Sequence, residues 1–126
     1  MKHPEYELQK QVCAYLKTHY SDVLFMSDTI ASVKLTAAQG ARNKAIQKDG
    51  FKTPDLIIFE PNKYYRGLFI ELKVESPFKK DGTLKKNAHL EAQQKSINDL
   101  NDKGYFALFS WGFDMTKRFI DDYMKL

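Results

Sequence analysis

The chain has 126 residues, of which 43% are apolar and 29% are charged, and its formal net charge is +4. These proportions are typical of a globular protein, and the length fits a single domain that spans residues 1–126. No apolar run approaches the roughly 20 residues that cross a bilayer, and the polar start MKHPEYELQKQ contains no secretory signal. We therefore expect a cytoplasmic protein without a membrane partner.

The first half of the chain predicts a helix, a strand and a second helix. Apolar residues at helical spacing indicate a helix over residues 5–19, with Pro4 at a favoured first position. VLFMS, residues 23–27, is typical of a short strand. Helix formers dominate residues 36–48, and Gly50 follows them as a stop signal.

The central segment predicts a β-hairpin followed by a basic loop. TPDLIIFE and GLFIELKV have the composition of strands, and PNKYYR between them begins with a Pro-Asn turn signal. Pro54 fits only at the beginning of its strand, because proline cannot donate a hydrogen bond to a neighbouring strand. Residues 76–87, SPFKKDGTLKKN, are polar and basic, with Asp81-Gly82 as their turn.

The last third of the chain predicts a helix, a strand and a helix. The first of these helices covers residues 88–102 and is closed by Gly104, YFALFS is the strand, and the final helix covers residues 114–124. Strands that lack polar alternation and are interleaved with helices imply a sheet covered on both faces. The expected fold class is therefore α/β, with a central mixed β-sheet flanked by helices on both faces.

Two opposite charges interrupt the apolar strand GLFIELKVE. Side chains alternate along a strand, so Glu71 and Lys73 share one face, while the apolar residues between them share the other. A hairpin turn centred near Tyr64 would pair residues whose numbers sum to about 127. That register brings Asp55, at the beginning of the neighbouring strand, beside Glu71 and Lys73.

This combination of charges suits one kind of chemistry. Two adjacent carboxylates repel each other, and one nearby lysine offsets only part of that repulsion. A divalent cation such as Mg²⁺, which prefers carboxylate oxygens as ligands, would offset the rest. A lysine beside such a site can orient or deprotonate a water, or neutralise charge that builds on a phosphate. Asp55, Glu71, Lys73 and a metal ion thus suit phosphodiester hydrolysis. The alternative is purely structural: a half-buried Glu71–Lys73 pair, with Asp55 capping a strand.

The same residues resemble a known family. TPDLIIF followed by FIELKV resembles the PD-(D/E)xK nuclease signature. EYELQ resembles the E-x-x-[IL]-Q opening of the virus-type replication-repair nuclease (VRR-NUC) family, and HLEAQQKSINDLNDKGY resembles its Q-x-x-x-[IL]-x-x-L…GY helix. KKDGTLKKN is similar to a loop of small phage-type and bacterial members. The resemblance covers most of the chain and implies a restriction-endonuclease-like core, in a bacterial or phage-infected cell.

The resemblance also implies roles for the residues of the hairpin. Asp55 and Glu71 would be metal ligands, with the backbone carbonyl of Leu72 as a third oxygen, and Lys73 would be the catalytic lysine. The implied cofactor is Mg²⁺, for which Mn²⁺ would substitute. The chain departs from many members at Thr53, where they carry a glycine just before the PD.

Two helices would complete the implied site. Glu5 matches the helical glutamate, which would hold metal through water or a second cation, and Gln9, one turn later, would support it. Glu7 is a competing candidate for that glutamate. Gln93 matches the glutamine of the later helix and would orient the catalytic lysine or contact phosphate, with Gln94 as the neighbouring alternative.

Basic residues gather in two segments that flank the predicted hairpin. Either cluster alone is most simply a solvated surface, but two clusters around the same strands favour contact with a phosphate backbone. GARNK lacks the GK[ST] ending of a phosphate-binding loop, so no nucleotide cofactor is expected. The first cluster comprises Lys34, Arg42, Lys44, Lys48 and Lys52, and the second comprises Lys79, Lys80, Lys85 and Lys86. The candidate DNA contacts among them are Arg42, Lys44, Lys79, Lys80, Lys85 and Lys86.

The leading functional hypothesis is a Mg²⁺-dependent DNA endonuclease of the kind used in DNA repair. The sequence contains no separate sequence-reading domain, which favours recognition of branched DNA such as a four-way (Holliday) junction. Such a junction needs two symmetric cuts, which favours a homodimer. The alternatives are a less selective nickase, flap or end-processing nuclease with the same site, or a catalytically idle DNA-binding module.

Overall fold

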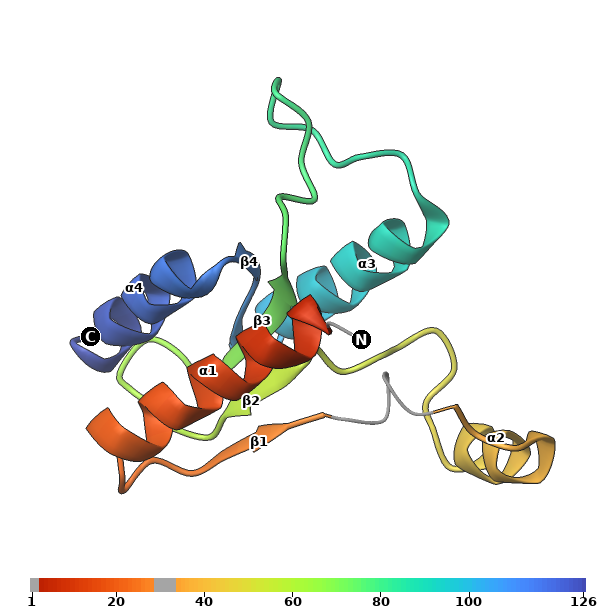
Figure 1. Cartoon of the computed structure of the whole chain (residues 1–126), viewed down its shortest axis with the longest axis horizontal. Coiled ribbons are helices and arrows are strands. Elements are labelled where there is room, and N and C mark those ends of the chain that lie inside the picture. The colour runs from red at the N-terminus through yellow and green to blue at the C-terminus, as the bar shows by residue number, and fades with distance from the viewer. Residues whose placement is uncertain (1–2, 29–33) are drawn as a thin grey trace.

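The computed structural model describes residues 3–28 and 34–126 of the chain, which form one four-stranded sheet and helices on both of its faces. The helices alternate with the strands in the order that the sequence predicts (Figure 1). The fold class, α/β with a mixed sheet, is confirmed. In chain order the elements are α1 (Pro4–His19), β1 (Phe25–Ser27), α2 (Ala37–Ala45), β2 (Leu56–Ile58), β3 (Leu68–Lys73), α3 (Ala88–Asp102), β4 (Phe106–Trp111) and α4 (Phe113–Met124).

The strands lie side by side in the order β1-β2-β3-β4. The two pairings that involve β2 are antiparallel, whereas β3 and β4 are parallel. A parallel neighbour cannot be reached by a tight turn, so the chain crosses from β3 to β4 through α3. β3 is therefore an internal strand with a partner on each side, and it carries Glu71 and Lys73.

Each face of the sheet has its own apolar core. Leu56, Ile70 and Leu72 pack against α1 and α4 on one face. On the other face, Phe69 and Phe109 join the buried residues of α3. Strand alternation therefore places the charged side chains of β3 on the α3 side and its aliphatic side chains under α1 and α4.

The pairing of β2 with β3 differs from the predicted register by one residue. Leu56 pairs with Ile70, so the numbers of paired residues sum to 126. Continued by one step, this register puts Asp55 directly opposite Glu71, and directly opposed residues of an antiparallel pair point to the same face. The predicted sum of about 127 is corrected, because the turn between the strands is centred one half-residue earlier than expected.

Four predicted elements are shorter in the structure than the sequence suggests, and β2 and β3 each lose residues at both ends of TPDLIIFE and GLFIELKV. The first strand begins at Phe25, two residues later than predicted. The second helix covers only Ala37–Ala45, and it has no buried residue. It is held at its beginning by a capping box in which Thr36 and Gln39 exchange hydrogen bonds. Without packing to extend it, a short helix ends within a few turns. Figure 1 shows α2 at the end of the molecule away from the sheet.

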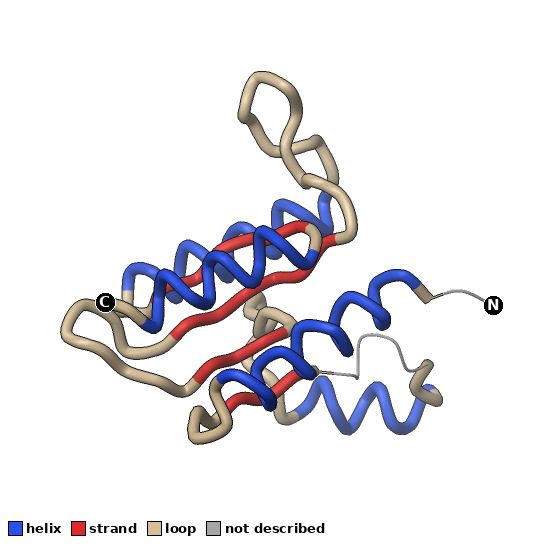
Figure 2. Tube along the Cα trace, turned by 60° about the vertical axis from the view of Figure 1, so that its left-hand side comes forward, coloured by secondary structure: helices blue, strands red, loops and turns tan. Residues whose placement is uncertain are grey.

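Residues 76–87 form a projecting loop, which we call the finger (Figures 1 and 2). Its base is closed by a bridge between Phe78 and Leu84 and by a 2.7 Å hydrogen bond from the Lys79 N–H to the Thr83 carbonyl. The Phe78 ring packs against Phe109 with 5.8 Å between ring centroids. The finger therefore rises from the end of β3 on a firm apolar base.

None of the described helices is both long enough and apolar enough to cross a membrane.

Candidate active site

The centre of the site is a pair of carboxyl groups, Asp55 and Glu71, on neighbouring strands. Asp55 precedes β2 and is partly buried, and Glu71 lies in β3 with 7% of its surface exposed. The backbone N–H of Leu72 donates a 3.0 Å hydrogen bond to Asp55 Oδ2, which holds that carboxyl group against β3. The strand pairing that brings two acidic residues together is therefore the same pairing that the apolar residues of the hairpin enforce.

The pKa values of both carboxyl groups are raised above their ordinary values. Burial raises the pKa of Glu71, and the negative charge of Asp55 and their mutual hydrogen bond contribute further, giving a pKa of about 8. Burial also raises the pKa of Asp55, against the opposing effect of the hydrogen bonds from Glu71 and Leu72. The charges of Lys73 and Lys52 lower both pKa values without cancelling the burial.

Lys73 lies on the same face as Glu71, but it does not form an ion pair with either carboxyl group. The ion pairs among the described residues join other side chains, all of them on α3 and α4. The Lys73 ammonium instead lies 5.9 Å from the centroid of the Phe109 ring, on the neighbouring strand β4. The structural alternative of a Glu71–Lys73 ion pair is therefore not what the structure shows, and the ammonium group keeps its donors for another partner.

Helix α3 reaches the pair through Gln93. This side chain is 8% exposed, and its Nε2 donates a 2.8 Å hydrogen bond to Glu71 Oε1. Gln94, the neighbouring alternative, is half-buried and donates to Asn98 on its own helix. Of the two glutamines, Gln93 is the one that the structure places in the site.

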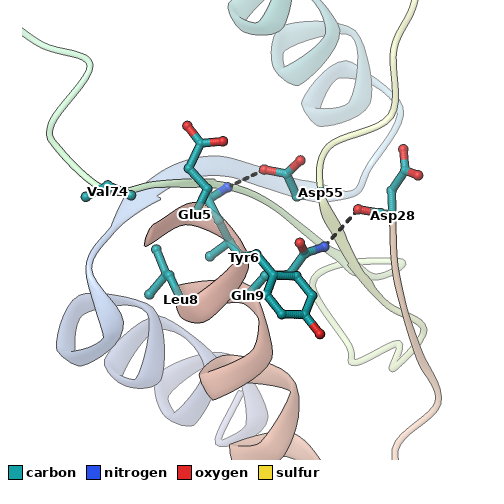
Figure 3. Close-up of a pocket in the computed structure, with 8 residues that line it drawn as sticks. Glu5, Tyr6, Leu8, Gln9, Asp28, Asp55 and Val74 are labelled. Carbon is teal, nitrogen blue, oxygen red and sulfur yellow. Dashed lines mark hydrogen bonds between the residues drawn. The ribbon is translucent and has the colours of Figure 1, made fainter. Parts of the chain in front are cut away.

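Helix α1 approaches the pair from the other side. A cavity of about 90 Å³ lies between α1 and the sheet, and Glu5, Gln9 and Asp55 contribute to its lining (Figure 3). Gln9 donates hydrogen bonds to the Ser27 hydroxyl and to the Asp28 carbonyl, the latter at 2.8 Å, so it fixes α1 against the end of β1. The pocket is lined by Glu5, Tyr6, Leu8, Gln9, Asp28, Asp55, Leu72 and Val74. Glu7, the competing candidate, is not in this lining.

The donor set suits a divalent cation in part. Asp55 and Glu71 supply two carboxylates whose raised pKa values reflect an unfavourable accumulation of buried negative charge, which a cation would relieve. Glu5 faces the same pocket as Asp55. However, within residues 3–28 and 34–126 the structure brings together no group of three or more acidic, His or Cys side chains close enough to hold a metal. The residues present therefore fit a cation held directly by two carboxylates.

The basic residues of both predicted clusters are exposed. Those of the finger follow β3 directly, and those of α2 lie on the outlying helix. Lys52 lies close enough for its charge to lower the pKa of both acids, and its N–H donates a 3.1 Å hydrogen bond to Ser96 of α3. The candidate DNA contacts, Arg42, Lys44, Lys79, Lys80, Lys85 and Lys86, are all on the surface. Lys34, Lys48 and Lys52 are exposed as well.

Three further side chains of the site lie outside the residues that the sequence motifs single out. Phe109 belongs to an apolar strand and is expected only in the core, yet its ring faces Lys73. Asp28 follows a short strand and lines the pocket with Glu5. His89 lies at the beginning of α3 and contacts Gln93. Its spacing of four residues from Gln93, one helical turn, is the signal that could have identified it.

The structure is similar to a solved structure described as a "VRR_NUC domain protein". The two share 24% of their residues, the alignment covers 100% of this chain and 92% of the other, and the TM-score is 0.67. No family model and no curated protein matches the chain. The fold is therefore restriction-endonuclease-like, of the VRR-NUC kind, as the sequence resemblance predicts.

Proposed function

We propose that this protein is a metal-dependent nuclease that hydrolyses phosphodiester bonds in DNA. The observation that carries the proposal is the buried Asp55–Glu71 pair, with Lys73 on the same face and free of an ion pair with it. The similarity to a VRR_NUC domain protein supports the same conclusion. A structural salt bridge would instead neutralise its charges internally.

In this proposal Asp55, Glu71 and the backbone carbonyl of Leu72 would hold Mg²⁺, or Mn²⁺ in its place. Glu5, which lines the pocket beside Asp55, would support the cation through water. When bound, the cation supplies Lewis-acid stabilisation of the negative charge that develops on the phosphate. The protein's own side chains and backbone would orient the attacking water and position the carboxyl groups.

Lys73 orients the attacking water and balances charge on the phosphate oxygens. Its position over the Phe109 ring keeps the ammonium group on the same face of the sheet as the carboxyl groups, without an ion pair that would neutralise its charge. The Leu72 N–H holds Asp55, and Gln93 holds Glu71, so both carboxyl groups are positioned before a substrate arrives.

The substrate we propose is branched DNA, with a homodimer making two symmetric cuts. The finger supports this choice, because a basic loop that projects from the end of β3 could contact two arms of a branched DNA at once. Lys79, Lys80, Lys85 and Lys86 on the finger and Arg42 and Lys44 on α2 would contact phosphates, so binding would follow backbone geometry more than base sequence.

The test is cleavage of labelled linear duplex, flap, fork and four-way junction DNA, with Mg²⁺, Mn²⁺ or EDTA. Wild type should cut only with metal, and Lys73→Ala should lose at least roughly a hundredfold in rate while DNA binding is retained. Lys95→Ala is the matched control, because Lys95 is an exposed lysine paired only with Asp99 on α3.

Equal cleavage by Lys73→Ala and wild type would overturn the proposed chemistry. A preference for linear duplex over the branched substrates would overturn the proposed substrate and leave the chemistry in place. Binding of DNA without cleavage under any metal condition would indicate an idle binding module.

A further inference from the structure

The Gln93 side chain makes an unusual set of contacts. Its Nε2 lies 2.8 Å from Glu71 Oε1 and 3.2 Å from the Nε2 of His89. Its Oε1 is buried and has no hydrogen-bond partner among the described residues. Most buried polar atoms in proteins have a partner, so an orphaned carbonyl oxygen calls for an explanation.

Hydrogen-bond chemistry fixes the roles of the three groups. An amide nitrogen has two hydrogens and cannot accept, so both neighbours of Gln93 Nε2 must act as acceptors. Glu71 accepts through its carboxyl oxygen, and His89 must accept through the lone pair on Nε2, with its own proton on Nδ1. Both hydrogens of the amide nitrogen thus have an acceptor, whereas the amide oxygen has no donor among the described residues.

The reversed orientation of the amide would be worse. With Glu71 ionised, as it would be when a cation is bound, turning the amide by half a rotation would place Oε1 against a carboxylate oxygen that only accepts and against the His89 lone pair. It would also leave the amide hydrogens without these partners in a buried position. The ionised Glu71 carboxylate, together with His89 in the tautomer that carries its proton on Nδ1, therefore selects a single orientation of the amide.

The local structure keeps His89 in place for this contact. The Asn87 side chain caps α3 and accepts hydrogen bonds from the backbone N–H of His89 at 2.8 Å and of Leu90 at 3.1 Å. His89 and Gln93 are then one helical turn apart on the same face of α3. His89 itself is exposed, so nothing in its own burial requires this contact.

We propose that His89 is a positioning residue of the site, which accepts a hydrogen bond from Gln93 and thereby fixes the amide that holds Glu71. The effect on turnover rests on the proposed nuclease function, whereas the orientation of the amide does not. His89 acts through Gln93 and does not touch the reacting groups.

Two substitutions separate this role from a general effect of changing the residue. In His89→Gln, the new amide oxygen lies the same number of bonds from Cβ as the imidazole Nε2, so it can accept from Gln93. In His89→Asn, the same chemical group is one bond too short. Gln94→Ala is the control on the neighbouring position, because its side chain faces Asn98 and not the site.

The first measurement is hydrogen exchange of the Gln93 side-chain amide by ¹⁵N–¹H NMR, with the Gln93→Leu variant used to assign its resonances. Wild type, His89→Gln and Gln94→Ala should exchange at similar rates. His89→Asn should exchange roughly fivefold to tenfold faster, the effect of losing one hydrogen bond. An unchanged rate in His89→Asn would overturn the proposal, whether or not the protein cleaves DNA.

The second measurement is steady-state cleavage by the same variants. His89→Asn should lower kcat by roughly fivefold to tenfold and leave KM within about twofold, and His89→Gln should restore kcat. Loss of amide protection without any change in kcat would overturn the role in positioning. If wild type cleaves nothing, the proposed function fails, and the exchange rates still decide whether His89 fixes the amide.

Discussion

At the scale of single residues, the site is defined by groups whose charges are not neutralised by their neighbours. Burial raises the pKa values of both Asp55 and Glu71, and the Lys73 ammonium lies over the Phe109 ring and forms an ion pair with neither carboxyl group. Each of these positions costs stability, because buried charge is favourable only when it is paired or hydrogen-bonded. Such an unfavourable arrangement in an internal strand is typical of a functional site.

The raised pKa of Glu71 predicts how stability depends on pH in the absence of a divalent cation. Its pKa is about 8 in the folded protein and 4.5 as the ordinary value, so the folded state retains a proton that the unfolded chain has released. The free energy of unfolding should therefore fall as the pH rises from about 4.5 to about 8. Thermal melting monitored by circular dichroism should show a Tm lower by at least about 3 °C at the upper end.

Two controls assign this pH effect to the carboxyl pair. Glu71→Gln should flatten the pH dependence, because the amide cannot be deprotonated. Mg²⁺ should raise the Tm of wild type more at about pH 8 than at about pH 5, since protons and cations compete for the same oxygens. A wild-type Tm that rises with pH over this range, or an identical slope in Glu71→Gln, would contradict the prediction.

At the scale of elements, the sequence predicts the order of helices and strands because each carries a strong local signal. α3 is an example: Asn87 at its start and Gly104 after its end give the predicted bounds. α2 is shorter than predicted, because helix formers extend to Lys48 but none of the residues of α2 is buried, so no packing stabilises a longer helix. Local signals are therefore reliable where tertiary packing reinforces them.

Strand alternation and the predicted hairpin identify only the part of the site that lies on β2 and β3. Glu71 and Lys73 share a face by alternation, and Asp55 joins them once the hairpin forms, even with the register one residue away from the prediction. The contact of Gln93 with Glu71 and that of Phe109 with Lys73 depend on which helix and which strand lie beside β3. That choice is made by the whole core and has no local sequence signal.

The finger is the element for which we predict the largest effect on DNA affinity. Replacing Lys79 and Lys80 together with Gln should weaken binding to all DNA substrates and lower the salt dependence of binding, by a slope of about one for each phosphate that the protein no longer neutralises. Fluorescence anisotropy at several salt concentrations measures both quantities. Because the finger base is closed by Phe78 and Leu84, the exposed lysines can change without unfolding the loop.

Lys95→Gln is the matched control for this measurement, since it removes one exposed positive charge from the surface of α3. An equal reduction of affinity in the control, or an unchanged salt slope in the double variant, would show that the finger acts only through overall charge.

At the scale of the whole molecule, the proposed homodimer needs an interface. β1 is the outermost strand of the described sheet, next to β2, and Leu24 and Met26 are 72% and 56% exposed there. Phe59, whose N–H donates to the Leu24 carbonyl, is 51% exposed beside them. An exposed apolar edge strand is a surface that proteins usually cover, and a second copy of the chain would cover it.

We predict that Met26→Lys, which places a charge on this edge, shifts the protein from dimer to monomer. Analytical ultracentrifugation at micromolar concentration measures the change. Met115 is not a suitable control position, because its sulfur accepts a hydrogen bond from the Trp111 N–H. Arg118→Glu, on the exposed face of α4, is a suitable one. A wild-type monomer, or a dimer that survives Met26→Lys, would contradict the interface.

The closed base of the finger has a consequence for how proteins of this shape diversify. The strand with Glu71 and Lys73 enters the finger, and the helix with His89 and Gln93 leaves it, while Phe78 and Leu84 join the two limbs at the bottom. We expect that residues 79–83, beyond the Phe78–Leu84 bridge, can change in number or in charge without moving the carboxyl pair. One continuous stretch of chain thus contains both a projecting loop and the strand and helix that position the carboxyl pair.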